Sequence, residues 1–171
     1  MRQFLFFIIP LLSITVEAQN SLHDLLKTFN AETVPYMSVQ ELAMPKTDAV
    51  ILDARELDEF EVSRIPNAIH VGYDQFDIKT VQSKVREFSK PIVVYCSIGI
   101  RSEDIGEKLK KAGYTNVFNL YGGIFEWKNK GLPVFDSADK ETDKVHAFSK
   151  SWSKWLKTGE KVYGKDKKKN E

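Results

Sequence analysis

One short segment of the chain combines a nucleophile, a turn residue and a fixed positive charge. Cys96 is the only cysteine of the chain, and Gly99 and Arg101 follow it three and five positions later. A thiol beside a cation at a helix N-terminus has a lowered pKa and reacts as the thiolate. The segment therefore predicts a nucleophilic cysteine. The alternative is that Cys96 is a small buried residue at the end of a strand.

The residues on either side of this segment predict a strand that leads into a helix. The apolar and β-branched run 92–95 precedes Cys96 and is typical of a buried strand. Ser102, two acidic residues and two apolar residues four positions apart follow it, which is typical of a capped helix start. The backbone N–H groups of such a loop converge on one point, where the helix dipole adds positive potential. We expect an anion or thiolate to be stabilised there.

Further strands and helices are predicted to alternate along the chain. The predicted strands are 33–38, 49–54, 68–72, 92–95 and 116–121, and the predicted helices are 20–30, 38–43, 56–62, 74–88, 102–112 and 124–130. This alternation predicts an α/β fold with a parallel sheet covered on both faces. Ligands of such sheets bind beyond the carboxyl ends of the strands. Asp53 and Arg55 fall at one such end, where we expect them to form a structural ion pair.

Several motifs, in one order along residues 36–135, resemble a single rhodanese-homology domain. The matching motifs are Asp53–Glu56, Glu59-Phe60, Arg64–Ala68, Cys96–Ser102, Gly122-Gly123 and Trp127. The resemblance implies a three-layer α/β/α fold with a central, mostly parallel sheet of about five strands. It also implies a sulfurtransferase in which Cys96 attacks a sulfane-sulfur donor such as thiosulfate. The sulfur would be carried as a persulfide and passed to cyanide or a thiol.

In this family the backbone amides of the cysteine loop form the anion cradle. The corresponding residues here are Ser97, Ile98, Gly99, Ile100, Arg101 and Ser102. The loop lacks the second basic residue of the thiosulfate-preferring type and the Gly and Ser pattern of the mercaptopyruvate type, so the donor stays open. Two other functions remain as alternatives: a non-catalytic rhodanese-like binding module, and a phosphatase- or arsenate-reductase-like enzyme. The short loop favours sulfur over phosphate transfer.

The first 18 residues differ in character from the rest of the chain. Arg2 precedes an apolar stretch, and Val16-Glu17-Ala18 places small residues at a cleavage site. This pattern predicts a secretory signal peptide cut after Ala18 and export to the periplasm or medium. A membrane anchor is the alternative, but the apolar stretch is shorter than the roughly 20 residues of a spanning helix. No stable membrane span is expected after cleavage.

The remaining segments flank the predicted domain. Residues 19–35 are predicted to form a helical extension, 136–158 an amphipathic helix and 159–171 a Lys-rich disordered tail. Apolar residues within 139–157 fall near one helical face, which would pack on the domain or dock a protein or membrane partner. The net charge of +1 gives no indication of nucleic-acid binding. One cysteine and three scattered histidines predict no zinc site, and we expect no cofactor.

Overall fold

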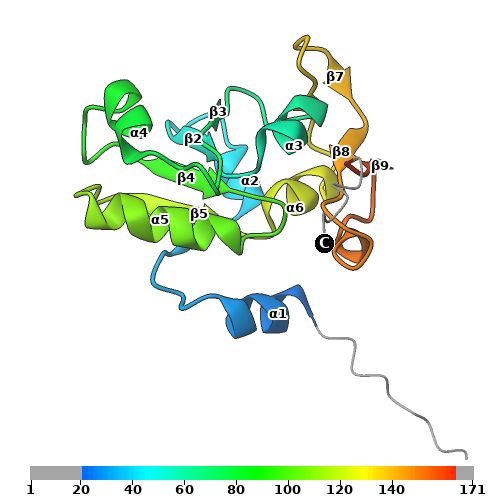
Figure 1. Ribbon diagram of the computed structural model, residues 1–171, viewed down its shortest axis with the longest axis horizontal. Helices are drawn as coiled ribbons and strands as arrows, with labels where there is room; N and C mark the ends of the chain where they lie inside the picture. Colours follow the sequence, from blue (N-terminus) through cyan, green and yellow to red (C-terminus); the bar gives the residue numbers. More distant parts are fainter. Residues whose placement is uncertain (1–20, 165–171) are drawn as a thin grey trace, which may run out of the picture.

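The computed structural model describes residues 21–164 and is built around a five-stranded parallel sheet (Figure 1). The strand order is β1-β5-β4-β2-β3. The strands are β1 (Tyr36–Met37), β2 (Val50–Asp53), β3 (Ile69–His70), β4 (Ile92–Tyr95) and β5 (Val117–Leu120). All neighbouring strands run parallel, which confirms the predicted α/β class. The strand that precedes Cys96 is the central one.

Alternation of apolar residues along β4 builds a core on each face of the sheet. Ile92 and Val94 pack in one core, and Val93 and Tyr95 pack in the other. All four side chains are fully buried, and each such apolar side chain contributes about 1.5–3 kcal/mol. A strand buried on both faces is expected for a parallel sheet with helices on each side.

Helices form the two outer layers, as the three-layer prediction requires. The helices α4 (Ile78–Lys84) and α5 (Arg101–Lys111) cover one face, with Val81, Ile105 and Leu109 buried against the sheet. The helices α2 (Val39–Leu42) and α6 (Gly123–Asn129) cover the other face. The short helix α3 (Leu57–Val62) follows β2 at the edge where Cys96 lies.

The predicted elements around the sheet are present, but β1, β3 and α4 are shorter than predicted. The extension helix α1 (Leu22–Phe29) starts at Ser21, whose side chain and that of Asp24 form a capping box. The helix α4 starts later than the predicted 74–88 because the Asp77 side chain caps its N-terminus, and it ends at Lys84 because Val85 has extended backbone. Phe88, which lies within the predicted range, falls beyond the end of this helix and is 45% exposed.

The predicted C-terminal helix over 136–158 is wrong. The segment after β6 (Val134–Phe135) forms β7 (Glu141–Thr142), β8 (Lys144–His146) and a 3-10 turn, η1 (Ser153–Trp155). β8 pairs in parallel with β9 (Glu160–Val162), and this partner is too far along the chain for local periodicity to predict the pairing. The left-handed backbone of Phe148, with φ of +62°, also interrupts a helix.

The same segment nevertheless packs across the domain, as one of the two sequence interpretations proposed. Val145 and Leu156 are fully buried in the core that also contains Tyr95. Trp152 meets Phe29 of α1 edge-on, with 6.1 Å between ring centroids. β9 places part of the predicted disordered tail in regular structure. The predicted signal peptide and residues 165–171 lie outside the described residues.

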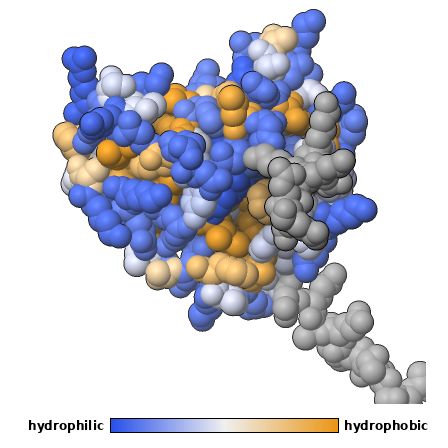
Figure 2. Space-filling model, in the orientation of Figure 1, coloured by the Kyte–Doolittle hydropathy of each residue, from blue (hydrophilic) through white to orange (hydrophobic). Residues whose placement is uncertain are grey.

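Polar and charged side chains cover most of the face seen in Figure 2, and apolar residues gather in separate patches between them. Among the described residues no helix is long and apolar enough to cross a membrane. Nor does the described part of the chain contain a group of three or more His, Cys, Asp or Glu side chains placed to hold a metal ion.

Candidate active site

The loop between β4 and α5 curls around the thiol of Cys96. Cys96 directly follows the central strand and is 2% exposed. The backbone N–H of Gly99 donates to Sγ at 3.2 Å, and Gly99 itself has a φ of +110°. This backbone conformation is one that glycine adopts without strain. Ser102 lies inside the first turn of α5 instead of capping it, with its hydroxyl 3.6 Å from Sγ.

The N-terminus of α6 holds this loop from the other side. The backbone N–H groups of Ile124 and Phe125 donate to the carbonyls of Cys96 and Ser97 at 3.0 and 3.1 Å. Gly123 lets the α6 backbone lie this close to the loop, because a Cβ atom at this position would lie 2.2 Å from the Cys96 carbonyl oxygen. The Gly122-Gly123 pair, which the sequence showed only as one of the matching motifs, thus positions the nucleophile.

Asn119 anchors the loop from β5 and was not identified from the sequence. Its side-chain amide donates to the Gly99 carbonyl at 2.8 Å and accepts from the Ser102 hydroxyl at 2.7 Å. Asn30 donates to the same Gly99 carbonyl at 2.8 Å. Asn119 is fully buried, and a buried polar group needs partners. An amide side chain in a strand predicted to be buried was therefore the feature of the sequence that could have identified Asn119.

Arg101 is paired with an acidic residue instead of standing as an isolated cation. Its Nη1 and Nη2 atoms lie 2.7 and 2.8 Å from the two carboxylate oxygens of Glu59 on α3. Nη2 also donates to the Ser97 hydroxyl at 3.1 Å. The ring of Phe148 covers the guanidinium, with its centroid 4.9 Å from Cζ. Most of the positive charge beside the thiol is therefore compensated by Glu59.

The surroundings of Cys96 still favour the thiolate. Burial by itself raises the pKa of the thiol, but the charge of Arg101 and hydrogen bonds from Ser102 and Gly99 outweigh it. The net pKa lies below its ordinary value, as expected for a cysteine at the N-terminus of a helix. For Glu59, burial raises the pKa, and the hydrogen bond and charge of Arg101 lower it further than burial raises it.

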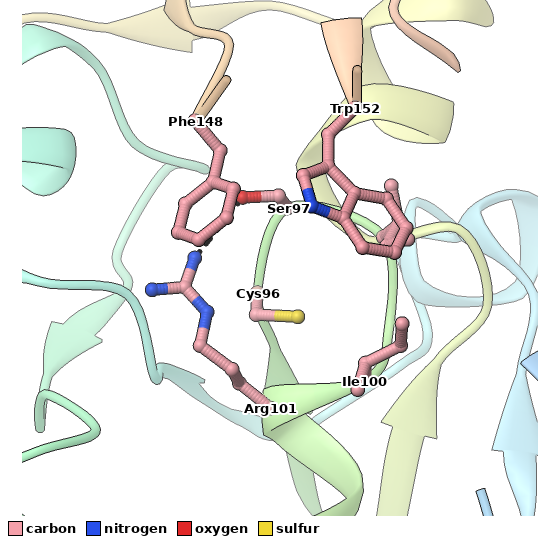
Figure 3. A pocket seen from close by; sticks show the side chains of 7 residues that line it. Cys96, Ser97, Ile100, Arg101, Phe148 and Trp152 are labelled. Carbon is pink, nitrogen blue, oxygen red and sulfur yellow. Dashed lines mark hydrogen bonds between the residues drawn. The ribbon is translucent and has the colours of Figure 1, made fainter. Parts of the chain in front are cut away.

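A pocket of about 150 Å³ opens over the thiol (Figure 3). Its lining comprises Cys96, Ser97, Ile98, Ile100, Arg101, Phe148 and Trp152. Figure 3 shows Phe148 and Trp152 opposite the cysteine loop and the sulfur pointing into the space between these side chains. The two aromatic residues come from the C-terminal segment, whose packing brings them to a loop about fifty residues earlier. Sequence patterns gave no indication of this contact.

Asp53 and Arg55 lie near this edge of the sheet but outside the pocket lining. Their side chains are fully buried and joined by an ion pair of 2.5 Å. Asp53 also accepts from the hydroxyl of Tyr95, and Arg55 donates to the Ser63 carbonyl at 2.6 Å. These contacts tie β2, β4 and the chain after α3 together, consistent with the structural role expected from the sequence.

The acidic residues that follow the loop do not line the pocket. Glu103 is buried and accepts from the backbone N–H of Thr33 at 2.9 Å and from the Asn119 amide at 3.1 Å. Asp104 accepts from the hydroxyl of Tyr73 at 2.5 Å. Both carboxylates thus serve the packing of α5 rather than the site.

The chain is similar in sequence to several known proteins. Residues 38–130 match the family model of the Rhodanese-like domain. A thiosulfate sulfurtransferase GlpE from Coxiella burnetii is 33% identical over 101 residues, which cover 56% of this chain and 85% of the relative. A tRNA uridine(34) hydroxylase from an Enterobacter species is 34% identical over 117 residues. That match covers 63% of this chain but only 34% of the hydroxylase.

Solved structures share the same architecture. A thiosulfate sulfurtransferase from Pseudomonas aeruginosa superposes with a TM-score of 0.57 at 24% identity, over 72% of this chain and 23% of that protein. A rhodanese-related protein from Thermoplasma volcanium has a TM-score of 0.51 at 27% identity, over 58% of this chain and 96% of that one. At 24% identity, the similarity to the Pseudomonas aeruginosa protein shows a shared fold alone.

Proposed function

The chain belongs to the rhodanese-like domain family, and from this membership we propose that it is a sulfurtransferase with Cys96 as its nucleophile. One observation carries the proposal. The single cysteine lies at the N-terminus of α5, with a lowered pKa, beneath a pocket that can receive a substrate. The thiosulfate sulfurtransferase GlpE from Coxiella burnetii, of which the match covers 85%, supports the same reaction class.

The proposed reaction divides one difficult transfer into two displacements. The Cys96 thiolate attacks the outer sulfur of a sulfane donor, forming a new S–S bond while the bond to the donor breaks. The leaving group departs with the electron pair, as sulfite in the case of thiosulfate. A thiolate or cyanide acceptor then attacks the outer sulfur of the persulfide and releases the Cys96 thiolate. No oxidant or reductant is consumed, because the sulfane sulfur keeps its oxidation state.

The chain's own groups stabilise the two anionic sulfur species of this cycle. The N–H of Gly99 already donates to Sγ, and Arg101 supplies positive charge at the same place. Preorganised donors of this kind stabilise charge without reorganisation during the reaction. No general base is required, because a thiolate is already a nucleophile.

A turnover assay tests the proposal. Purified protein residues 19–171 and a Cys96→Ala variant are incubated with a sulfane donor and cyanide, and thiocyanate is measured. Thiosulfate and glutathione persulfide serve as donors. We expect thiocyanate formation by the unchanged protein and none above background by the variant. Equal rates for the two proteins would contradict the proposal, and so would the absence of turnover with these two donors and with an apolar hydropersulfide such as benzyl hydropersulfide. Phosphate release from an aryl phosphate would support the phosphatase alternative.

Export remains part of the proposal on the basis of residues 1–18 alone. Expression of the full chain in a Gram-negative host, followed by fractionation and N-terminal sequencing, tests it. We expect periplasmic protein that begins at Gln19. Protein that keeps its N-terminus and stays with the membrane would favour the anchor interpretation.

A further inference from the structure

The walls of the pocket over Cys96 are mainly apolar. Ile98 and Ile100 contribute from the cysteine loop, and Phe148 and Trp152 contribute from the C-terminal segment. Figure 3 shows the two aromatic rings on the side of the pocket opposite the loop. A cavity of about 150 Å³ with Leu, Ile and Phe walls holds a molecule the size of benzene. The space here is of that size, about 150 Å³, and has a nucleophile at its floor.

The charge at the pocket is poorly matched to a dianion. Arg101 is the only cationic side chain of the lining, and Glu59 binds both of its terminal nitrogens. Phe148 covers the guanidinium and separates it further from an incoming molecule. Thiosulfate carries two negative charges, and burying charge without a free counter-charge is costly. A donor without charge on its body avoids that cost.

The backbone of Phe148 adds an independent indication of a role in the site. Its φ of +62° lies in the left-handed region, which non-glycine residues occupy at a cost. The residue is 47% exposed, so burial of the ring does not by itself explain the conformation. Such backbone positions cluster where a side chain is held for function. Here the conformation places the ring at the mouth of the pocket.

Resting on the proposed sulfurtransferase function, we propose that the donor is an organic hydropersulfide with an uncharged, apolar body. Phe148 and Trp152 contact that body and set the preference over thiosulfate and charged persulfides. The terminal sulfur of R–S–SH then lies at Sγ of Cys96, and the R group fills the apolar space. The two aromatic residues are specificity determinants of the site, supplied from outside the family-matched region 38–130.

The transfer step balances without any further reactant. The Cys96 thiolate attacks the terminal sulfur of R–S–SH, the new S–S bond forms, and the original S–S bond breaks with the electron pair leaving on R–S⁻. The proton of the hydropersulfide passes to this more basic thiolate. The products are the Cys96 persulfide anion and R–SH.

A competition between two donors whose R groups are uncharged tests this preference. Benzyl and methyl hydropersulfide, released from acyl disulfide precursors, are each mixed with protein, and persulfide formation on Cys96 is followed by intact mass. We expect the unchanged protein to react about tenfold faster with the benzyl donor, after correction for their rates with a free thiol. In Phe148→Ala we expect this ratio to fall to near one. Trp152→Leu, which keeps an apolar residue against Phe29, should lower it as well.

Phe88→Ala is the matched control, because Phe88 is similarly exposed but lies far from the pocket lining. We expect it to keep the ratio of the unchanged protein. A benzyl-to-methyl ratio near one in the unchanged protein, or faster reaction with thiosulfate or glutathione persulfide, would overturn the inference and leave the sulfurtransferase function standing. Failure of every donor to add sulfur would overturn both.

Discussion

Glu59 and Arg101 form a bidentate ion pair beside the thiol of Cys96, with distances of 2.7 and 2.8 Å between their terminal atoms. The Glu59 side chain is 3% exposed and that of Arg101 is 15% exposed, so solvent screens the pair only weakly. The pair orients the guanidinium and at the same time reduces the positive potential at Sγ. The reactivity of the thiol is therefore set by two opposite charges and not by Arg101 alone.

Removing the charge of Glu59 should make Cys96 more acidic. In Glu59→Gln the positive charge of Arg101 is no longer compensated, so the thiolate is favoured and the thiol pKa falls. The rate of alkylation by iodoacetamide against pH measures this pKa, and its midpoint should move to lower pH. An unchanged midpoint would show that Arg101 does not act on the thiol. Glu61→Gln, an exposed position on the same helix, is the control.

The same variant should be less stable and less sensitive to acid. Breaking a buried pair by removing one partner costs about 3 kcal/mol. The pKa of Glu59 is below its ordinary value in the folded protein, so its stabilisation is present above about pH 4.5 and is lost as pH falls through the lower, folded value. Urea unfolding at several pH values should show this acid-dependent loss in the unchanged protein and a smaller one in the variant.

Substituting Gly123 should displace the cysteine loop. An added Cβ would lie 2.2 Å from the Cys96 carbonyl oxygen, which is backbone and has little freedom to move. We expect Gly123→Ala to lose several kcal/mol of stability and most of its persulfide formation. Gly131 has a similar φ of +73° with nothing within 4 Å of an added Cβ. Gly131→Ala should therefore lose only the backbone cost of about 1–2 kcal/mol, and equal losses in both variants would contradict the steric account.

Removing the buried amide of Asn119 should loosen the loop. Asn119→Ala removes the acceptor 2.7 Å from the Ser102 hydroxyl and one of the two side-chain donors to the Gly99 carbonyl. Unsatisfied buried groups of this kind cost about 1–3 kcal/mol. Denaturant unfolding measures the loss. Asn116→Ala, three positions earlier on the same segment, should be close to neutral, and a loss equal to that of Asn119→Ala would count against this anchoring role.

Asp53 is expected to matter for stability and not for the reaction. Asp53→Asn leaves the fully buried guanidinium of Arg55 without its counter-charge, which should cost about 3–5 kcal/mol. The folded fraction should still form the Cys96 persulfide, because Asp53 does not line the pocket. Asp48→Asn, which disrupts an exposed pair with Lys90, should change the unfolding midpoint far less. Loss of persulfide formation in folded Asp53→Asn protein would assign Asp53 to the chemistry.

Local patterns were sufficient to predict the central part of the site. The strand at 92–95, the loop after Cys96 and the following helix depend on residues within about twenty positions of one another. The apolar run of the strand and the charged residues at the helix start both lie within that stretch, so local periodicity predicts them. The alternation of strands and helices along the chain predicts a parallel sheet, so the fold class was accessible as well.

The contacts that tune the site depend on pairings across longer distances. Glu59 and Arg101 are 42 positions apart, and Glu59 by itself is an ordinary charged residue on the short helix α3, so no sequence pattern indicated that the two pair. The prediction for 139–157 failed because β8 takes its hydrogen-bond partner from β9 instead of from its own next turn. Phe148 and Trp152 were therefore assigned to a helical face, and their place over Cys96 could not be inferred.

The most direct test of the central claim is the intact mass of the reduced protein after incubation with a sulfane donor. We expect a gain of one sulfur, about +32 Da, that is removed by cyanide or a thiol and is absent from Cys96→Ala. The same gain in Cys96→Ala, or no gain from any donor while iodoacetamide still alkylates Cys96, would contradict sulfur transfer through this residue.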